Sequence, residues 1–119
     1  MPFHGVPPRR AWLFRPEPAA DVAVSDAAAW RLNPAHRWVY NKLELALSQG
    51  LTAAPAGVEP REMGLAADEP VFVRPITNLA GMSLGAYPDR ADSVAPPRGS
   101  FWSERLAGEQ SSTDCLVRD

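Results

Sequence analysis

Four segments of the chain carry residue types that suit the binding of a nucleoside triphosphate. Lys42 and Arg74 could supply the cations that phosphate oxygens require. The loop over residues 78–85 contains two glycines, which let backbone N–H groups approach phosphate oxygens closely. The extended segment 104–106 could bond the edge of adenine through its backbone, and the carboxylate of Glu109 could accept from ribose hydroxyls. Each feature alone is common, so their order along the chain is the stronger signal.

That order resembles the ATP-grasp superfamily, over about residues 41–119. Members have a helix with an Asp-Lys-like pair that ends in a Gly-containing turn before a proline, and Asn41-Lys42 and Gln49-Gly50 match these features. A strand with Val-Lys-Pro follows in the family, as Val73-Arg74-Pro75 does here, and a Gly-rich loop comes next. A strand and turn reading roughly Glu-Lys-hydrophobic-x-Gly-x-Glu complete the match at residues 104–109.

The resemblance implies ATP as the cofactor and a role for each matching residue. The helix lysine and the strand cation would contact phosphate, the loop would close over the triphosphate, the hinge would receive adenine, and the last carboxylate would bind ribose. The cofactor-binding residues expected on this basis are Lys42, Arg74, Gly81, Ser83, Gly85, Glu104, Arg105, Leu106 and Glu109. Such enzymes use ATP to phosphorylate a carboxylate and then transfer the acyl group to an amine or a thiol.

The sequence departs from the family pattern at several points. Arg74 replaces the usual lysine, which exchanges a point charge for a planar fork. The loop is also less rich in glycine than in many members. The magnesium carboxylates of the family come from strands that have no match in residues 1–119. We therefore expect a fragment or shortened product of a larger ligase-like protein, inactive alone, with magnesium bound only in the parent protein.

A second hypothesis is a non-catalytic interaction or structural module. A lysine on a helix is usually solvated, and a loop with two glycines can be a plain connection. His4 and His36 lack partners at metal-site spacing, so no metal site is predicted. The single cysteine, Cys115, alternates with apolar residues and reads as a buried strand thiol rather than a nucleophile.

Composition narrows the classes of partner. The formal net charge of −2 gives no drive towards nucleic acid or an anionic membrane surface. No segment approaches the roughly 20 apolar residues of a membrane span, and the N-terminus lacks the apolar core of a signal peptide. We therefore expect a cytoplasmic protein that binds a nucleotide, and not nucleic acid or membrane. A sheet face left uncovered by missing strands could promote self-association.

The elements that must position these residues read as an α+β fold. We expect an irregular segment over 1–33, with one short helix at 26–31, and a partial ATP-grasp-like domain over 34–119. Asn33 and Pro34 are a good N-cap and first residue for one main helix that runs to Gln49, because apolar residues recur along it every four positions.

This helix should pack on a small, mainly antiparallel sheet. Apolar runs or alternation predict strands at 11–14, 71–73, 101–105 and 113–117, with Pro75 ending the second. The proline- and glycine-containing segments 51–70 and 88–99 read as connections.

Overall fold

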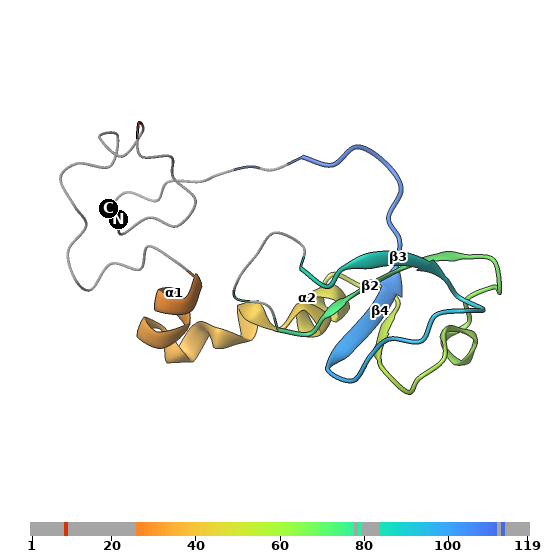
Figure 1. The fold of residues 1–119 in the computed structure, drawn as a ribbon, viewed down its shortest axis with the longest axis horizontal. Coiled ribbons are helices and arrows are strands. Elements are labelled where there is room, and N and C mark those ends of the chain that lie inside the picture. Colours follow the sequence, from red (N-terminus) through yellow and green to blue (C-terminus); the bar gives the residue numbers. More distant parts are fainter. Residues whose placement is uncertain (1–8, 10–25, 78, 80–83, 112, 114–119) are drawn as a thin grey trace.

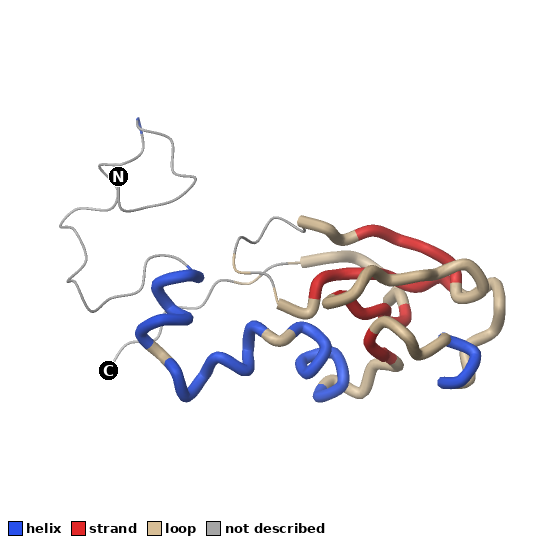
Figure 2. Tube along the Cα trace, turned by 60° about the horizontal axis from the view of Figure 1, so that its bottom comes forward, coloured by secondary structure: helices blue, strands red, loops and turns tan. Residues whose placement is uncertain are grey.

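The computed structural model describes Arg9 and residues 26–77, 79, 84–111 and 113, which form an α+β fold. Short helices flank a four-stranded antiparallel sheet (Figures 1 and 2). In chain order the elements are α1 (Asp26–Leu32), the 3₁₀ helix η2 (Pro34–Tyr40), α2 (Lys42–Ser48), β1 (Ala53–Pro55), the 3₁₀ helix η3 (Pro60–Met63), β2 (Pro70–Pro75), β3 (Tyr87–Arg90) and β4 (Ser100–Glu104). No described helix is long and apolar enough to cross a membrane.

The strand order in the sheet is β1-β4-β2-β3, and every neighbouring pair is antiparallel. Trp102 of β4 lies opposite Val73 of β2 on one side and opposite Ala54 of β1 on the other. Residues directly opposite one another in antiparallel strands project to the same face. The register therefore places Trp102 on one face of the sheet and its neighbour Phe101 on the other.

Each face of the sheet has its own hydrophobic cluster. On one face Trp102 packs with Val71 and Val73, and its indole Nε1–H donates to the carbonyl of Val58 at 2.7 Å. On the other face Phe101 packs against α2 and neighbouring residues. Trp102 and Phe101 are fully buried. Both faces of the two central strands therefore carry buried apolar side chains, and the expected self-association through an uncovered sheet face stays a prediction.

The expected single helix over 34–49 is wrong, because it is divided at Asn41 into η2 and α2. Asn41 has extended backbone, with φ of −81° and ψ of 98°, and its side chain accepts from the N–H of Glu44 at 3.0 Å. Its backbone also forms an isolated bridge with Thr77, and the next N–H, of Lys42, donates to the carbonyl of Ile76 at 2.7 Å. Pairing with the segment after β2 therefore competes with helix continuation at this residue.

Other expected elements have mixed outcomes. The helix at 26–31 is confirmed as α1, and the strands at 71–73 and 101–105 are confirmed as β2 and β4 with slightly different bounds. Pro75 ends β2 as expected. The expected connections are wrong in part, because β1 and η3 lie within the first and β3 includes residues 88–90 of the second. The strand at 11–14 lies outside the described residues, as does all of the strand at 113–117 except Thr113.

Candidate functional site

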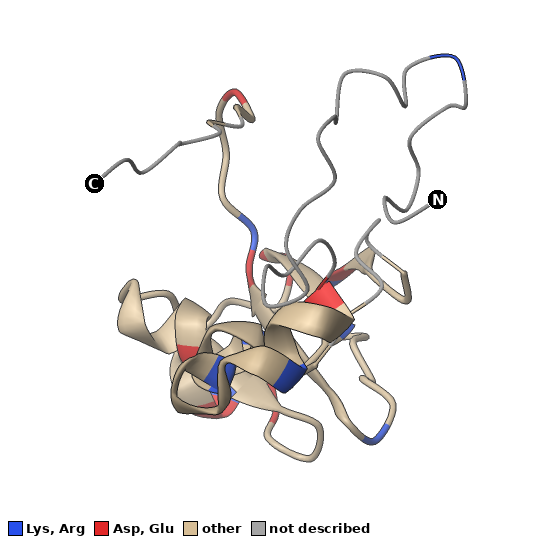
Figure 3. Cartoon of the chain, turned by 90° about the vertical axis from the view of Figure 1, so that its left-hand side faces the viewer, with Lys and Arg blue, Asp and Glu red and all other residues tan. Residues whose placement is uncertain are grey.

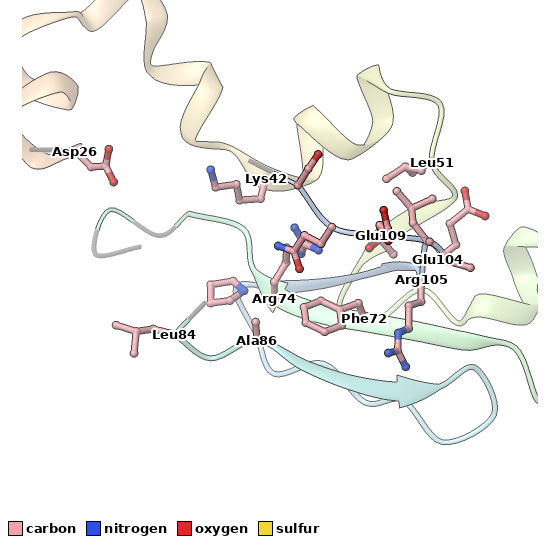
Figure 4. A pocket seen from close by; sticks show the side chains of 17 residues that line it. Asp26, Lys42, Leu51, Phe72, Arg74, Leu84, Ala86, Glu104, Arg105 and Glu109 are labelled. Atoms are coloured by element: carbon pink, nitrogen blue, oxygen red, sulfur yellow. The ribbon is translucent and has the colours of Figure 1, made fainter. Parts of the chain in front are cut away.

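The described part of the chain contains an open pocket of about 820 Å³ beside the sheet (Figure 4). The first residue of α2, the second half of β2, the turn before β3 and the segment after β4 contribute to its walls. Six residues from the expected nucleotide-binding set line it, namely Lys42, Arg74, Glu104, Arg105, Leu106 and Glu109. The fold thus brings together residues that are as far apart in the sequence as Lys42 and Glu109.

The expected glycine loop is placed only in part. Gly81 and Ser83 lie outside the described residues. Gly85 is described, but its neighbours Leu84 and Ala86 line the pocket and it does not. Its φ is 71°, and an added Cβ would lie 3.2 Å from the Cγ of Pro75. A positive φ is strained for residues with a side chain, so the visible role of this glycine is to form the turn before β3.

Arg74 is the pocket residue whose polar atoms are least satisfied. Its guanidinium carbon lies 5.1 Å from the ring centroid of Phe72, which is the geometry of a cation–π contact. Its Nε is buried and has no hydrogen-bond partner in the described structure. A buried donor without an acceptor costs about 1–3 kcal/mol. Arg74 also lines the pocket, where a planar guanidinium can bind a phosphate or carboxylate through two parallel bonds.

Lys42 enters the pocket from the start of α2. Its Nζ lies 6.0 Å from the ring centroid of Tyr40, and its side chain is only partly exposed. In Figure 4, Lys42 and Arg74 lie towards the same part of the hollow, whereas the side chain of Arg105 extends in a different direction. The two cations expected to contact phosphate, Lys42 and Arg74, thus line the same pocket.

Asp26 also lines the pocket, and sequence reasoning missed it. It is the first residue of α1, and its carboxylate accepts from the hydroxyl of Tyr40 at 3.3 Å. Arg37 holds α1 against η2, because its Nε–H donates to the carbonyl of Trp30 at 2.7 Å. Partial burial and the Asp26 carboxylate raise the pKa of Tyr40 above its usual value. No motif in the sequence connects Asp26 with the pocket. Asp26 lies on α1, and the direction of η2 decides where α1 lies relative to the pocket.

Glu104 has a protein partner for its carboxylate. Its Oε1 accepts from the N–H of Thr52 at 2.8 Å, and its own N–H donates to the carbonyl of Thr52 at 2.8 Å. The N–H of Arg105 donates to the carbonyl of Pro70 at 3.1 Å. Two backbone donors of the expected adenine-binding segment are therefore already used within the protein.

The described residues after Arg105 are exposed. Leu106 is 69% exposed, and Glu109 is also exposed. Neither residue hydrogen-bonds to another part of the described chain. Backbone and carboxylate groups on this side of the pocket can thus meet a ligand without first breaking a protein contact.

Comparison with protein-family models, with curated proteins and with solved structures found no match. No three His, Cys, Asp or Glu residues of the described structure are grouped so that they could hold a metal ion. The chemistry of the site therefore has to be argued from its own residues. The pocket lining combines basic side chains (Lys42, Arg74, Arg105) and acidic side chains (Asp26, Glu104, Glu109) beside a partly apolar wall.

Proposed function

We propose that the pocket binds ATP, as the nucleotide-binding part of an ATP-grasp ligase-like protein. The observation that supports this proposal best is the meeting of Lys42, Arg74 and the segment 104–109 around one hollow. The guanidinium of Arg74 lines the pocket and suits an anionic group, because its planar fork can bond two oxygens of a phosphate. In the parent protein, ATP would activate a carboxylate for attack by an amine or thiol.

The pose follows from where the polar groups lie. The triphosphate would lie towards Lys42 and Arg74, and the ribose hydroxyls would donate to Glu109. Adenine would meet the backbone at Leu106, because the N–H groups of Glu104 and Arg105 already bond Thr52 and Pro70. A volume of about 820 Å³ lies within the usual range of about 300–1,000 Å³ for small-molecule sites.

The binding should be weak in this chain alone. Asp26 and Glu109 place carboxylates in the same pocket as the cations, so they offset part of the attraction for a triphosphate. We expect a dissociation constant on the order of millimolar, which corresponds to about −4 kcal/mol. The proposal includes no magnesium site in the described residues. A cytoplasmic location, where ATP is abundant, stays a prediction.

Titration of the chain with ATP, followed by backbone amide shifts, tests the proposal. We expect shifts clustered at Lys42, Arg74 and residues 104–109, and Arg74→Ala should abolish them. Arg98→Ala is the matched control, because Arg98 is exposed and does not line the pocket. Scattered shifts, or equal affinity in Arg74→Ala and the wild type, would count against a nucleotide site here.

Inorganic tripolyphosphate separates recognition of the nucleotide from recognition of the anion. If the pocket binds adenine and ribose as well as phosphate, tripolyphosphate should cause only small changes in the amide shifts of Leu106 and Glu109. Equal shifts at these residues from both ligands would mean that phosphate alone is bound.

A non-catalytic interaction module is the second candidate, and one observation favours it. Trp38 and Val39 on η2 are 49% and 37% exposed, and Leu32 at the end of α1 is 41% exposed. Apolar side chains gathered on short neighbouring helices are typical of a protein-binding surface. By contrast, acidic and basic residues are interspersed over the described elements in the view of Figure 3, which does not favour nucleic acid.

The two candidates make different predictions for Trp38→Ser. Loss of a concentration-dependent association, with ATP shifts unchanged, would favour the interaction module for this surface. If neither the wild type nor Trp38→Ser sediments faster at high protein concentration, the support for an interaction module at this surface is lost.

A further inference from the structure

Glu104 and Thr52 form a reciprocal pair of hydrogen bonds between distant parts of the chain. The carboxylate Oε1 of Glu104 accepts from the N–H of Thr52, and the N–H of Glu104 donates to the carbonyl of Thr52, both at 2.8 Å. Both residues are partly buried. Glu104 is the last residue of β4, and Thr52 immediately precedes β1. The pair therefore extends the contact between these strands by one residue at the point where the chain leaves the sheet.

The chain that leaves the sheet forms one wall of the pocket. We call residues 106–111 the pocket wall, since all of them line the pocket. Arg105 makes one further bond, from its N–H to the carbonyl of Pro70 at 3.1 Å. The pocket wall itself is exposed and has no hydrogen bond to the rest of the described chain. Among the described residues, hydrogen bonds thus fix its direction only at its start, through Glu104 and Arg105.

We infer that Glu104 is a positioning residue, whose carboxylate orients the pocket wall through Thr52 instead of contacting the ligand. A charged acceptor strengthens a hydrogen bond, so a carboxylate holds the Thr52 N–H more firmly than a neutral group would. The same bond satisfies a partly buried backbone donor that would otherwise be unpaired. This inference rests on the proposed nucleotide site, and it changes the role that the family resemblance implies for Glu104.

Two substitutions separate positioning from ligand contact. Glu104→Gln keeps an oxygen that can accept from Thr52 but loses the negative charge, whereas Glu104→Ala loses the acceptor. If Glu104 positions the wall, the ATP dissociation constant of Glu104→Gln should stay within about threefold of the wild type, and that of Glu104→Ala should rise about tenfold or more. Equal weakening in both variants would overturn the inference, as would wild-type affinity in Glu104→Ala.

A readout without ligand keeps this test separate from the nucleotide proposal. Amide hydrogen exchange at Thr52 should be slow in the wild type and in Glu104→Gln, and fast in Glu104→Ala. Backbone ¹⁵N relaxation should show residues 106–109 less ordered in Glu104→Ala alone. If ATP fails to bind the wild type but this pattern is found, the nucleotide proposal fails and the positioning role stands. An unchanged Thr52 amide and unchanged order in Glu104→Ala would refute the positioning role.

Glu104→Asp provides a second variant in case Glu104→Ala does not fold. It keeps the charge but shortens the side chain by one methylene, which withdraws the carboxylate from the Thr52 N–H. We expect fast Thr52 exchange and a less ordered wall. Slow exchange and wild-type order in this variant would contradict the dependence on that contact.

Discussion

Replacing Arg74 with methionine should stabilise the protein while removing its capacity to bind an anion. The buried Nε without a partner costs about 1–3 kcal/mol in the ligand-free state. Loss of the cation–π contact with Phe72 costs about 0.5–1 kcal/mol, and a thioether against the ring returns about 0.3–1.5 kcal/mol. Since Arg74 is only half-buried, we take the lower part of the first range. Arg74→Met should therefore raise the free energy of unfolding by about 1 kcal/mol.

Urea unfolding and thermal unfolding measure this change. A gain of about 1 kcal/mol should raise Tm by about 4–8 °C in a domain of this size. ATP at ten times its dissociation constant should stabilise the wild type by about 1.4 kcal/mol and leave Arg74→Met unchanged. Arg98→Met is the control, because a substitution at this exposed residue should change stability by no more than about 0.5 kcal/mol.

The opposite result would refute the reasoning about Arg74. If Arg74→Met is less stable than the wild type by about 1 kcal/mol or more, the guanidinium is already satisfied in the free protein. The buried Nε would then not be a destabilising feature of the free protein. Stabilisation of Arg74→Met by ATP to the same extent as the wild type would separately show that the nucleotide does not use this cation.

Three other perturbations test the fold around the pocket. Trp102→Phe should lower the free energy of unfolding by about 1–3 kcal/mol in urea, because the carbonyl of Val58 loses its donor. Asn41→Ala should cost about 1 kcal/mol and reduce helical circular dichroism, because α2 loses its N-cap acceptor. The pKa of Tyr40 is raised, so the phenol keeps its proton to a higher pH in the folded state than in the unfolded state. Stability should therefore fall as the pH rises above the ordinary tyrosine value of 10.0, and Tyr40→Phe should make that fall smaller.

The strands that could be predicted are those whose own side chains form the core. Val71-Phe72-Val73 and Phe101-Trp102 are apolar runs, and both lie in the middle of the sheet. Ala53-Ala54-Pro55 and Tyr87-Pro88-Asp89-Arg90 carry little strand propensity. They become β1 and β3 because β4 and β2 offer them backbone partners. Such edge strands depend on residues far away in the sequence, so local patterns miss them.

Local sequence patterns also miss the division of the expected helix over 34–49 and the contacts that form the pocket, because both depend on residues far apart in the sequence. The apolar spacing from Val39 to Leu47 continues through Asn41 without a break, yet the backbone pairing of Asn41 with Thr77 divides the helix there. Lys42 and Arg74 line one pocket, but the spacing of these two residues in the sequence does not by itself indicate that they meet. The bond between Glu104 and Thr52 joins residues 52 positions apart, and neither residue type indicates it.

The position of β4 in the sheet sets the time at which the protein can fold during its synthesis. β4 lies between β1 and β2, although it is the last of the described strands to be made. A nascent chain without residues 100–104 can form the β2–β3 hairpin, but β1 has no strand to pair with. This nascent chain also lacks Phe101 and Trp102, the largest buried side chains of the two hydrophobic clusters. The apolar side chains of Val71 and Val73 therefore remain accessible to chaperones on the ribosome until β4 emerges and closes the sheet.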